Sequence, residues 1–262
     1  MKTAVQDIRD FVDQAELVLI GTGEEFERKK ILEQDPEYCA IQEKIKLAQV
    51  TWVKPYVDTY WLRERMQDKV PEALQHLKRL IDGKNYFIVS TSMNGFLLEA
   101  GFKDNRMVEP CGSYALMQCV NGCQDSLEET SENFLEQIKN CCQGSLEWES
   151  LSFNKCAGCG GKKVFNNLYA EHYLEQGYLP RWNTYMKWLQ GTVNRKVCII
   201  ELGEGLRYPS VIRWPFEKTA YLNKKAFFIR VHERLYQLTQ EIGEQGYSIA
   251  QNAVDFLNTL EN

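Results

Sequence analysis

The sequence predicts an α/β protein with a doubly wound, mostly parallel, Rossmann-like sheet, a helical insertion and a small zinc-binding subdomain. Short apolar runs, which are typical of buried strands, alternate along the chain with segments of helical periodicity. Four spaced cysteines interrupt this alternation near the middle of the chain. With 262 residues, the chain is long enough for one domain with an insertion, or for one large and one small domain.

The predicted elements follow in order. A helix is expected over 5–15, where apolar residues recur at helical spacing, and a strand over 17–20. The segment 25–82 is rich in helix-forming residues and is expected to form the insertion, with its last helix over 71–82. The remaining expected elements are strands at 86–89, 197–202 and 226–231, a short helix at 96–100 and a closing helix over 248–260.

The composition argues against several classes of protein. A net charge of -5 is unsuited to a sequence-independent nucleic-acid binder, which needs clustered cations, so no nucleic-acid partner is expected. The apolar run 17–20 is too short for a signal peptide or a membrane span, so we expect a cytoplasmic protein without a membrane partner. In that reducing compartment, a patterned subset of the nine cysteines indicates metal or thiol chemistry rather than disulfides.

Three predicted strands end in small polar loops. These loops are Gly21-Thr22-Gly23, the segment 90–95 and Gly203-Glu204-Gly205. Ligands of a doubly wound sheet bind beyond the carboxyl ends of its strands, so the loops are predicted to line one site. Short glycine patterns also occur in ordinary turns, and Ser92 and Asn94 in the second loop equally fit caps of the following helix.

Four cysteines have the spacing of a structural zinc site. They form two close pairs, Cys119-x3-Cys123 and Cys156-x2-Cys159, and each pair suits one edge of a tetrahedron. Glycines around the second pair permit a tight turn that directs amide hydrogens at the sulfurs. Unrelated thiols or a redox-active pair are the alternatives. Because four ligands leave no open coordination position, the metal is expected to stabilise the fold and to take no part in chemistry.

Taken together and in this order, the three loops, the segment 109–112 and the cysteine pairs resemble the motifs of the sirtuin family. The resemblance covers nearly the whole chain. It implies an NAD-binding Rossmann-like domain, here 1–112 and 165–262, with 113–164 inserted as the zinc-binding subdomain. The segment 208–216 adds a weaker likeness to the macrodomain-linked branch, which is associated with ADP-ribosyl transfer.

The resemblance also implies roles for individual residues. His232 stands where an asparagine of the family meets the adenosine ribose, and Cys111 stands where the family has its catalytic histidine. Glu204 has the chemistry to bond ribose hydroxyls. The implied cofactor-binding residues are Gly21, Thr22, Gly23, Ser92, Gly203, Glu204, Gly205 and His232, and the candidate catalytic residues are Ser92, Asn94 and Cys111.

The implied function is the NAD-dependent modification of a protein. An unperturbed thiol is mostly protonated at neutral pH, so replacing the imidazole with Cys111 harms deacylation more than it harms cleavage of the nicotinamide–ribose bond. We therefore favour transfer of ADP-ribose to a protein acceptor. Lysine deacylation is one alternative, and a non-catalytic sensor or scaffold that binds NAD or ADP-ribose is another. NAD and structural zinc are the implied cofactors.

Overall fold

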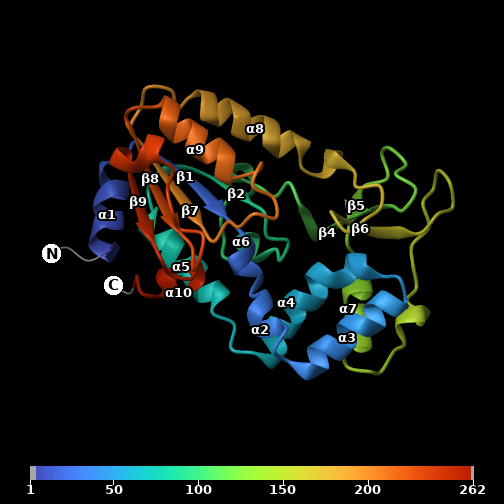
Figure 1. Cartoon of the computed structure of the whole chain (residues 1–262). Helices are drawn as coiled ribbons and strands as arrows, with labels where there is room; N and C mark the ends of the chain where they lie inside the picture. Colours follow the sequence, from blue (N-terminus) through green and yellow to red (C-terminus); the bar gives the residue numbers. More distant parts are fainter. Residues whose placement is uncertain (1–3, 261–262) are drawn as a thin grey trace.

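The structure, a computed structural model, describes residues 4–260 and is centred on a six-stranded parallel sheet (Figure 1). The chain enters at the middle of this sheet and builds outward in both directions, so the sheet is doubly wound, as predicted. The strands, in spatial order, are β3 (Met107–Val108), β2 (Asn85–Ser90), β1 (Leu17–Thr22), β7 (Val197–Leu202), β8 (Ala226–Val231) and β9 (Gly246–Ile249).

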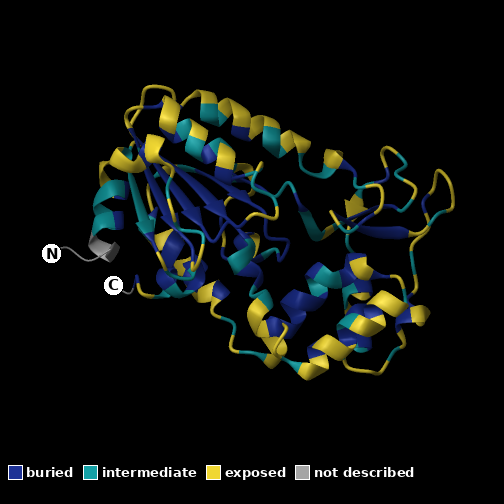
Figure 2. Ribbon diagram, in the orientation of Figure 1, coloured by how far each residue is buried: buried dark blue, intermediate teal, exposed yellow. Residues whose placement is uncertain are grey.

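Helices cover both faces of the sheet. Side chains that alternate along β1 enter two separate cores: Leu19 packs in the core that contains Phe216, and Ile20 in the core that contains Leu77. The central strands are therefore buried on both faces, which explains their continuous apolar runs (Figure 2). One face carries α8 (Leu179–Gln190) and α9 (Arg213–Leu222), and the other carries α1 (Ala4–Gln14), α5 (Val70–Leu80) and α10 (Ala253–Asn258).

A smaller module lies beside the sheet (Figure 1). It combines an antiparallel sheet of β5 (Glu128–Glu129), β4 (Gly112–Cys119) and β6 (Lys163–Asn167) with α3 (Pro36–Leu47), α4 (Lys54–Arg65) and α7 (Glu132–Cys142). The ring of Trp52 lies 5.4 Å from that of Phe165 and 6.0 Å from that of Phe134, measured between centroids. These aromatic contacts join the helical insertion and the cysteine-rich segment into one packed unit.

Short elements complete the chain, and the helices within residues 4–260 include none that is both long and apolar enough to cross a membrane. The short helices are α2 (Lys29–Leu32) and α6 (Phe96–Glu99). Single 3₁₀ turns are η1 (Glu24–Glu27), η2 (Thr51–Val53), η3 (Asp104–Arg106), η4 (Trp148–Ser150), η5 (Glu175–Gly177) and η6 (Gln240–Gln245).

All four predicted strands are confirmed, but the prediction of a closing helix over 248–260 is wrong at its start. Ser248 and Ile249 belong to β9, where they pair with Arg230 and Val231, and the helix begins at Ala253. The sequence analysis also missed β3, which has two residues and no pattern of its own. The predicted end of the zinc-binding subdomain, residue 164, falls inside β6, which spans Lys163–Asn167 because it pairs with β4.

Candidate functional site

The carboxyl ends of the central strands bring the three polar loops together. The amide of Thr91 donates a hydrogen bond to the carbonyl oxygen of Thr22 (2.9 Å), which joins the second loop to the first. The amide of Gly23 donates to the carbonyl oxygen of Leu202 (2.8 Å), which joins the first loop to the third. Residues far apart in the sequence thus share one edge of the sheet, where ligands of this sheet type bind.

Close packing accounts for the glycines of the first loop. A Cβ atom at Gly23 would lie 2.5 Å from the amide nitrogen of Glu204, and one at Gly21 would lie 2.5 Å from Cγ2 of Ile212. No side chain fits at either position, because protein atoms already occupy the space. In the third loop, Gly203 has a φ of +64° and Gly205 packs against the carboxylate of Glu24. The glycines therefore allow the two loops to touch.

Glu204 connects the second and third loops through its side chain. The hydroxyl of Thr91 donates a 2.7 Å hydrogen bond to Oε2 of Glu204, and Nη2 of Arg213 donates to the Glu204 carbonyl oxygen (2.6 Å). The side chain is buried, and this burial raises the pKa of the Glu204 carboxyl to about 8. A carboxyl with such a pKa exchanges its proton near neutral pH, as a general acid or base requires.

The polar residues of the second loop are engaged within the protein. Nδ2 of Asn94 donates to the carbonyl oxygen of Phe26 (3.0 Å), and Oδ1 of Asn94 accepts from the amide of Phe96 (3.2 Å). The hydroxyls of Ser92 and Ser90 lie 2.9 Å apart. Asn94 thus links η1 to the first amide of α6, whose N-cap is Gly95, and both Ser92 and Asn94 are buried.

The Cys111 thiol is 1% exposed, and its environment keeps it protonated. Burial, followed by the nearby carboxyl groups of Glu204 and Glu27, raises the pKa of this thiol far above its usual range. A thiolate would therefore be strongly disfavoured at neutral pH. In this environment Cys111 cannot act as a base.

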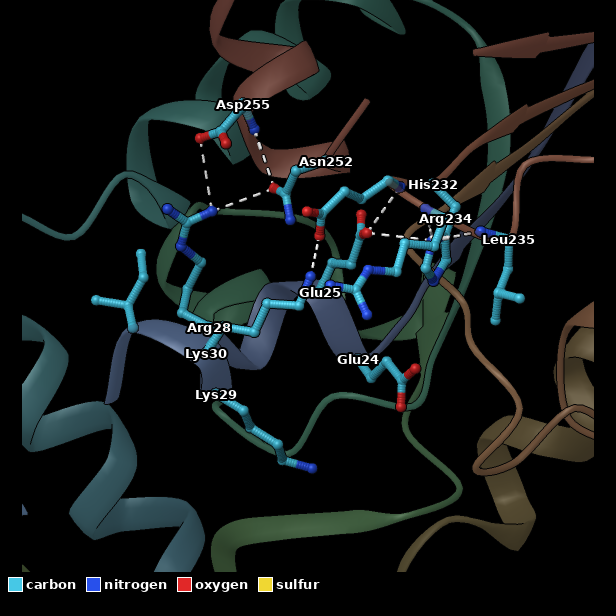
Figure 3. A pocket seen from close by; sticks show the side chains of 12 residues that line it. Glu24, Glu25, Arg28, Lys29, Lys30, His232, Arg234, Leu235, Asn252 and Asp255 are labelled. Carbon is cyan, nitrogen blue, oxygen red and sulfur yellow. Dashed lines mark hydrogen bonds and ion pairs between the residues drawn. The ribbon is translucent and has the colours of Figure 1, made fainter. Parts of the chain in front are cut away.

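His232 lines a cavity of about 500 Å³ beyond the ends of β1, β8 and β9 (Figure 3). Its Nδ1 accepts hydrogen bonds from the amides of Arg234 (3.0 Å) and Leu235 (3.1 Å), which leaves the proton on Nε2. Burial lowers the pKa of His232 to about 4, so the ring is neutral at pH 7. Nε2 is buried without a hydrogen-bond partner among the described residues, and a ligand with an acceptor atom would satisfy it.

Glu25 and Arg28, both from the segment after β1, shape the charge of the same cavity (Figure 3). The Glu25 carboxylate accepts hydrogen bonds from the amides of Glu233 (2.9 Å) and Ala253 (2.7 Å). Arg28 pairs with Asp255 at 3.5 Å, while the exposed Arg234 also lines the cavity. The cavity therefore has both a carboxylate and cationic groups at its walls.

Arg207 ties the main domain to the smaller module. Its guanidinium lies 3.3 Å from the Glu27 carboxylate and donates to the hydroxyl of Tyr169 (2.9 Å). These contacts cross from the loop after β7 to η1 and to the segment after β6. The sequence analysis missed Arg207 and Glu25, and it did not foresee the bond of Thr91 to Glu204, because these contacts join residues that are remote along the chain.

The four predicted metal-binding cysteines come together. The sulfurs of Cys119, Cys123, Cys156 and Cys159 all lie within 4.8 Å of one another. Sγ of Cys159 accepts hydrogen bonds from Nδ2 of Asn121 and the amide of Gly161, both at 3.4 Å, and these donors lower the pKa of the Cys159 thiol to about 6. Four clustered sulfurs with amide donors fit tetrahedral zinc, and four protein ligands leave no open coordination position, as in a structural site.

The strand order, the three loops and the inserted cysteine module together define a sirtuin-type fold. A solved structure described as the structural basis of sirtuin substrate affinity matches with a TM-score of 0.58 at 15% identity, covering 99% of this chain and 98% of that chain. A Sir2 structure with a bound peptide and NAD+ matches with a TM-score of 0.55 at 13% identity, covering 99% of this chain and 97% of that chain. The resemblance to sirtuins is therefore confirmed at the level of the fold.

A relative with a curated activity matches over nearly the whole chain. A protein ADP-ribosyltransferase from Staphylococcus aureus is 20% identical over 274 aligned positions, which cover 96% of this chain and 85% of that protein. No family model matches the sequence. The chain is thus a divergent sirtuin-fold protein that is similar to an ADP-ribosylating enzyme.

Proposed function

We propose that the protein is an NAD-dependent protein ADP-ribosyltransferase, which cleaves the nicotinamide–ribose bond of NAD and transfers ADP-ribose to a protein acceptor. The observation that carries this proposal is the chemistry at the ends of the strands. Cys111 is a protonated, buried thiol, whereas Glu204 is a buried carboxyl that titrates near neutrality. The likeness to the S. aureus transferase supports transfer over deacylation.

Several residues are proposed to hold NAD. His232 presents an unpartnered Nε2 donor to the adenosine side, and the exposed Arg234 brings a positive charge for the pyrophosphate. The first loop (Gly21, Thr22 and Gly23) and the third (Gly203, Glu204 and Gly205), which a backbone hydrogen bond from Gly23 to the end of β7 holds together, are proposed to contact the phosphates and the adenosine. Ser92 and Asn94 lie in the second loop of the same edge and are proposed to support the ribose next to nicotinamide.

Bound NAD supplies an activated ribosyl bond, whose cleavage develops positive charge on the ribose. Glu204 is proposed to take the proton of the acceptor nucleophile, because its pKa of about 8 lies close to the pH at which the reaction would run. Thr91 holds the carboxyl by its 2.7 Å hydrogen bond, and Arg213 holds the backbone of the same residue. In this proposal Cys111 packs beside the acceptor and transfers no proton.

Incubation with labelled NAD and cell lysate tests the proposal. We expect release of nicotinamide and label on a protein, and we expect Glu204→Gln to reduce both about a hundredfold. Glu244→Gln, an exposed carboxyl on η6, is the matched control and should retain full activity.

Three outcomes distinguish the alternatives. Loss of the acyl group from an acylated lysine peptide, without protein labelling, would favour a deacylase. NAD or ADP-ribose binding in calorimetry without turnover would favour a sensor or scaffold. Absence of both binding and turnover would contradict all three functions.

A further inference from the structure

A second cavity, of about 390 Å³, lies between the small sheet and the β3 edge of the main sheet. One wall is formed by β4 and β5, a second by the segment 107–109, and a third by 173–181. It shares no lining residue with the cavity around His232. Its size is within the range of cavities that bind ligands.

Glu109 brings an unsatisfied acceptor to this cavity. Its Oε1 is buried and has no hydrogen-bond partner among the described residues. Burial raises the pKa of the Glu109 carboxyl to about 7, so the group gains or loses its negative charge near neutral pH. Buried carboxylate oxygens are normally hydrogen-bonded. A ligand that donates a hydrogen bond to Oε1 would therefore complete the site.

The other walls favour a cation. Tyr173 and Tyr178, whose rings are stacked with centroids 6.1 Å apart and an interplanar angle of 19°, both line the cavity, and aromatic rings attract cations. The cation at this site, Arg181, is already paired with Asp104 through a 2.8 Å hydrogen bond from Nε to Oδ1. Glu129 adds a further carboxylate at the exposed edge. The charged groups at this cavity are thus three carboxyls, of Asp104, Glu109 and Glu129, and one arginine that is already paired, a balance that favours a cation over an anion.

We infer that this cavity binds a cationic side chain, a lysine ammonium or an arginine guanidinium, from a basic segment of the acceptor protein. The ammonium or guanidinium donates to Oε1 of Glu109, and its alkyl stem packs against the tyrosine rings. The segment Glu109-Pro110-Cys111-Gly112 connects this cavity with Cys111, whose neighbours include Glu204. The identification of the partner as the acceptor rests on the proposed function, whereas the preference of the cavity for a cation does not.

Calorimetry of the full chain, without NAD, tests the cavity by itself. The probes are short capped peptides of glycine and serine with one central lysine, arginine, norleucine or glutamate. We expect the lysine and arginine peptides to bind about tenfold or more tightly than the norleucine and glutamate peptides. Glu109→Gln should lower the affinity for the cationic peptides about tenfold, and Glu244→Gln, next to the opposite edge of the sheet, should not change it.

A second variant locates the binding independently of Glu109. Ala115 lies on β4 at the cavity, and Ala115→Lys would place a competing cation there. Because Ala115 is exposed, the change should leave the hydrophobic cores intact. We expect it to abolish binding of the cationic peptides. Equal binding of the norleucine peptide, undiminished binding to both variants, or no binding of any peptide would overturn the inference. NAD binding, measured separately, should be unchanged in both variants, so a failure of the proposed function gives a different result.

Discussion

The Thr91 hydroxyl, just beyond β2, donates a 2.7 Å hydrogen bond to the carboxyl of Glu204, just beyond β7. The two residues are 113 positions apart in the sequence. The bond links two loops of the candidate site and holds a carboxyl that burial would otherwise leave unsatisfied. The proposed role of Glu204 as a base depends on that hydrogen bond.

The raised pKa of Glu204 predicts a stability that falls as the pH rises. The folded state binds the proton up to a pKa of about 8, whereas the unfolded state releases it near 4.5, so the stabilising contribution is complete below 4.5 and is lost through 8. Between pH 5.5 and 8.5 we expect the free energy of unfolding to fall about 3 kcal/mol more for the wild type than for Glu204→Gln. Urea denaturation at both pH values measures this difference, and parallel curves would contradict the assigned protonation.

Cys111→Ser should have little effect on turnover. The buried thiol is protonated, so a hydroxyl of similar size replaces it without removing a base. Nicotinamide release by the variant should stay within about threefold of the wild type, which corresponds to less than 1 kcal/mol in the barrier. A loss of more than tenfold in a variant that still binds NAD would show that the sulfur takes part in the reaction.

His232→Phe should weaken ADP-ribose binding about tenfold. The change removes the unpartnered Nε2 donor of a residue that lines the cavity, and also the Nδ1 acceptor that orders the loop at 234–235. Titration calorimetry with ADP-ribose measures the effect. His172→Phe, at an exposed position, is the control and should bind like the wild type. Equal affinities for both variants would exclude His232 from the nucleotide site.

Removal of zinc should unfold the smaller module. The purified protein should contain about one zinc per chain, and Cys156→Ser should lose it and lower the melting temperature by about 10 °C or more. Cys39→Ser changes an exposed cysteine of α3 and should retain both the metal and the stability. If the wild type contained no zinc and Cys156→Ser had the same melting temperature as the wild type, the four cysteines would be free thiols.

The buried ion pair between β7 and β8 predicts an asymmetric pair of variants. Nε of Arg230 lies 2.7 Å from Oε1 of Glu201, and both side chains are almost fully buried. Arg230→Met should cost about 3–5 kcal/mol of unfolding free energy, because it leaves the buried Glu201 with Arg213 alone, at 3.4 Å, and removes the partner of Glu217 as well. Arg195→Met breaks an exposed pair with Glu16 and should cost far less. Thermal or urea denaturation compares the two, and similar losses would contradict this account.

The parts of the fold that the sequence predicted well carry their own local pattern. The strand expected at 197–202 has the bounds of β7, because every residue in it is buried and apolar residues dominate the run. β3 and β9 lack such a pattern, and they exist because a neighbouring strand offers unpaired hydrogen-bonding groups. The closing helix starts later than predicted for the same reason, because Ser248 and Ile249 pair with β8 instead.

The sequence by itself determined the alternation of strands and helices, the three loops and the spacing of the metal-binding cysteines, because these depend on neighbours in the chain. Only the tertiary structure decided the chemistry. Thr91 and Glu204, or Glu25 and the amide of Ala253, 228 positions apart, meet because the sheet brings their segments to one edge. Burial then sets the protonation of Cys111 and Glu204, and burial depends on what the rest of the chain packs around them.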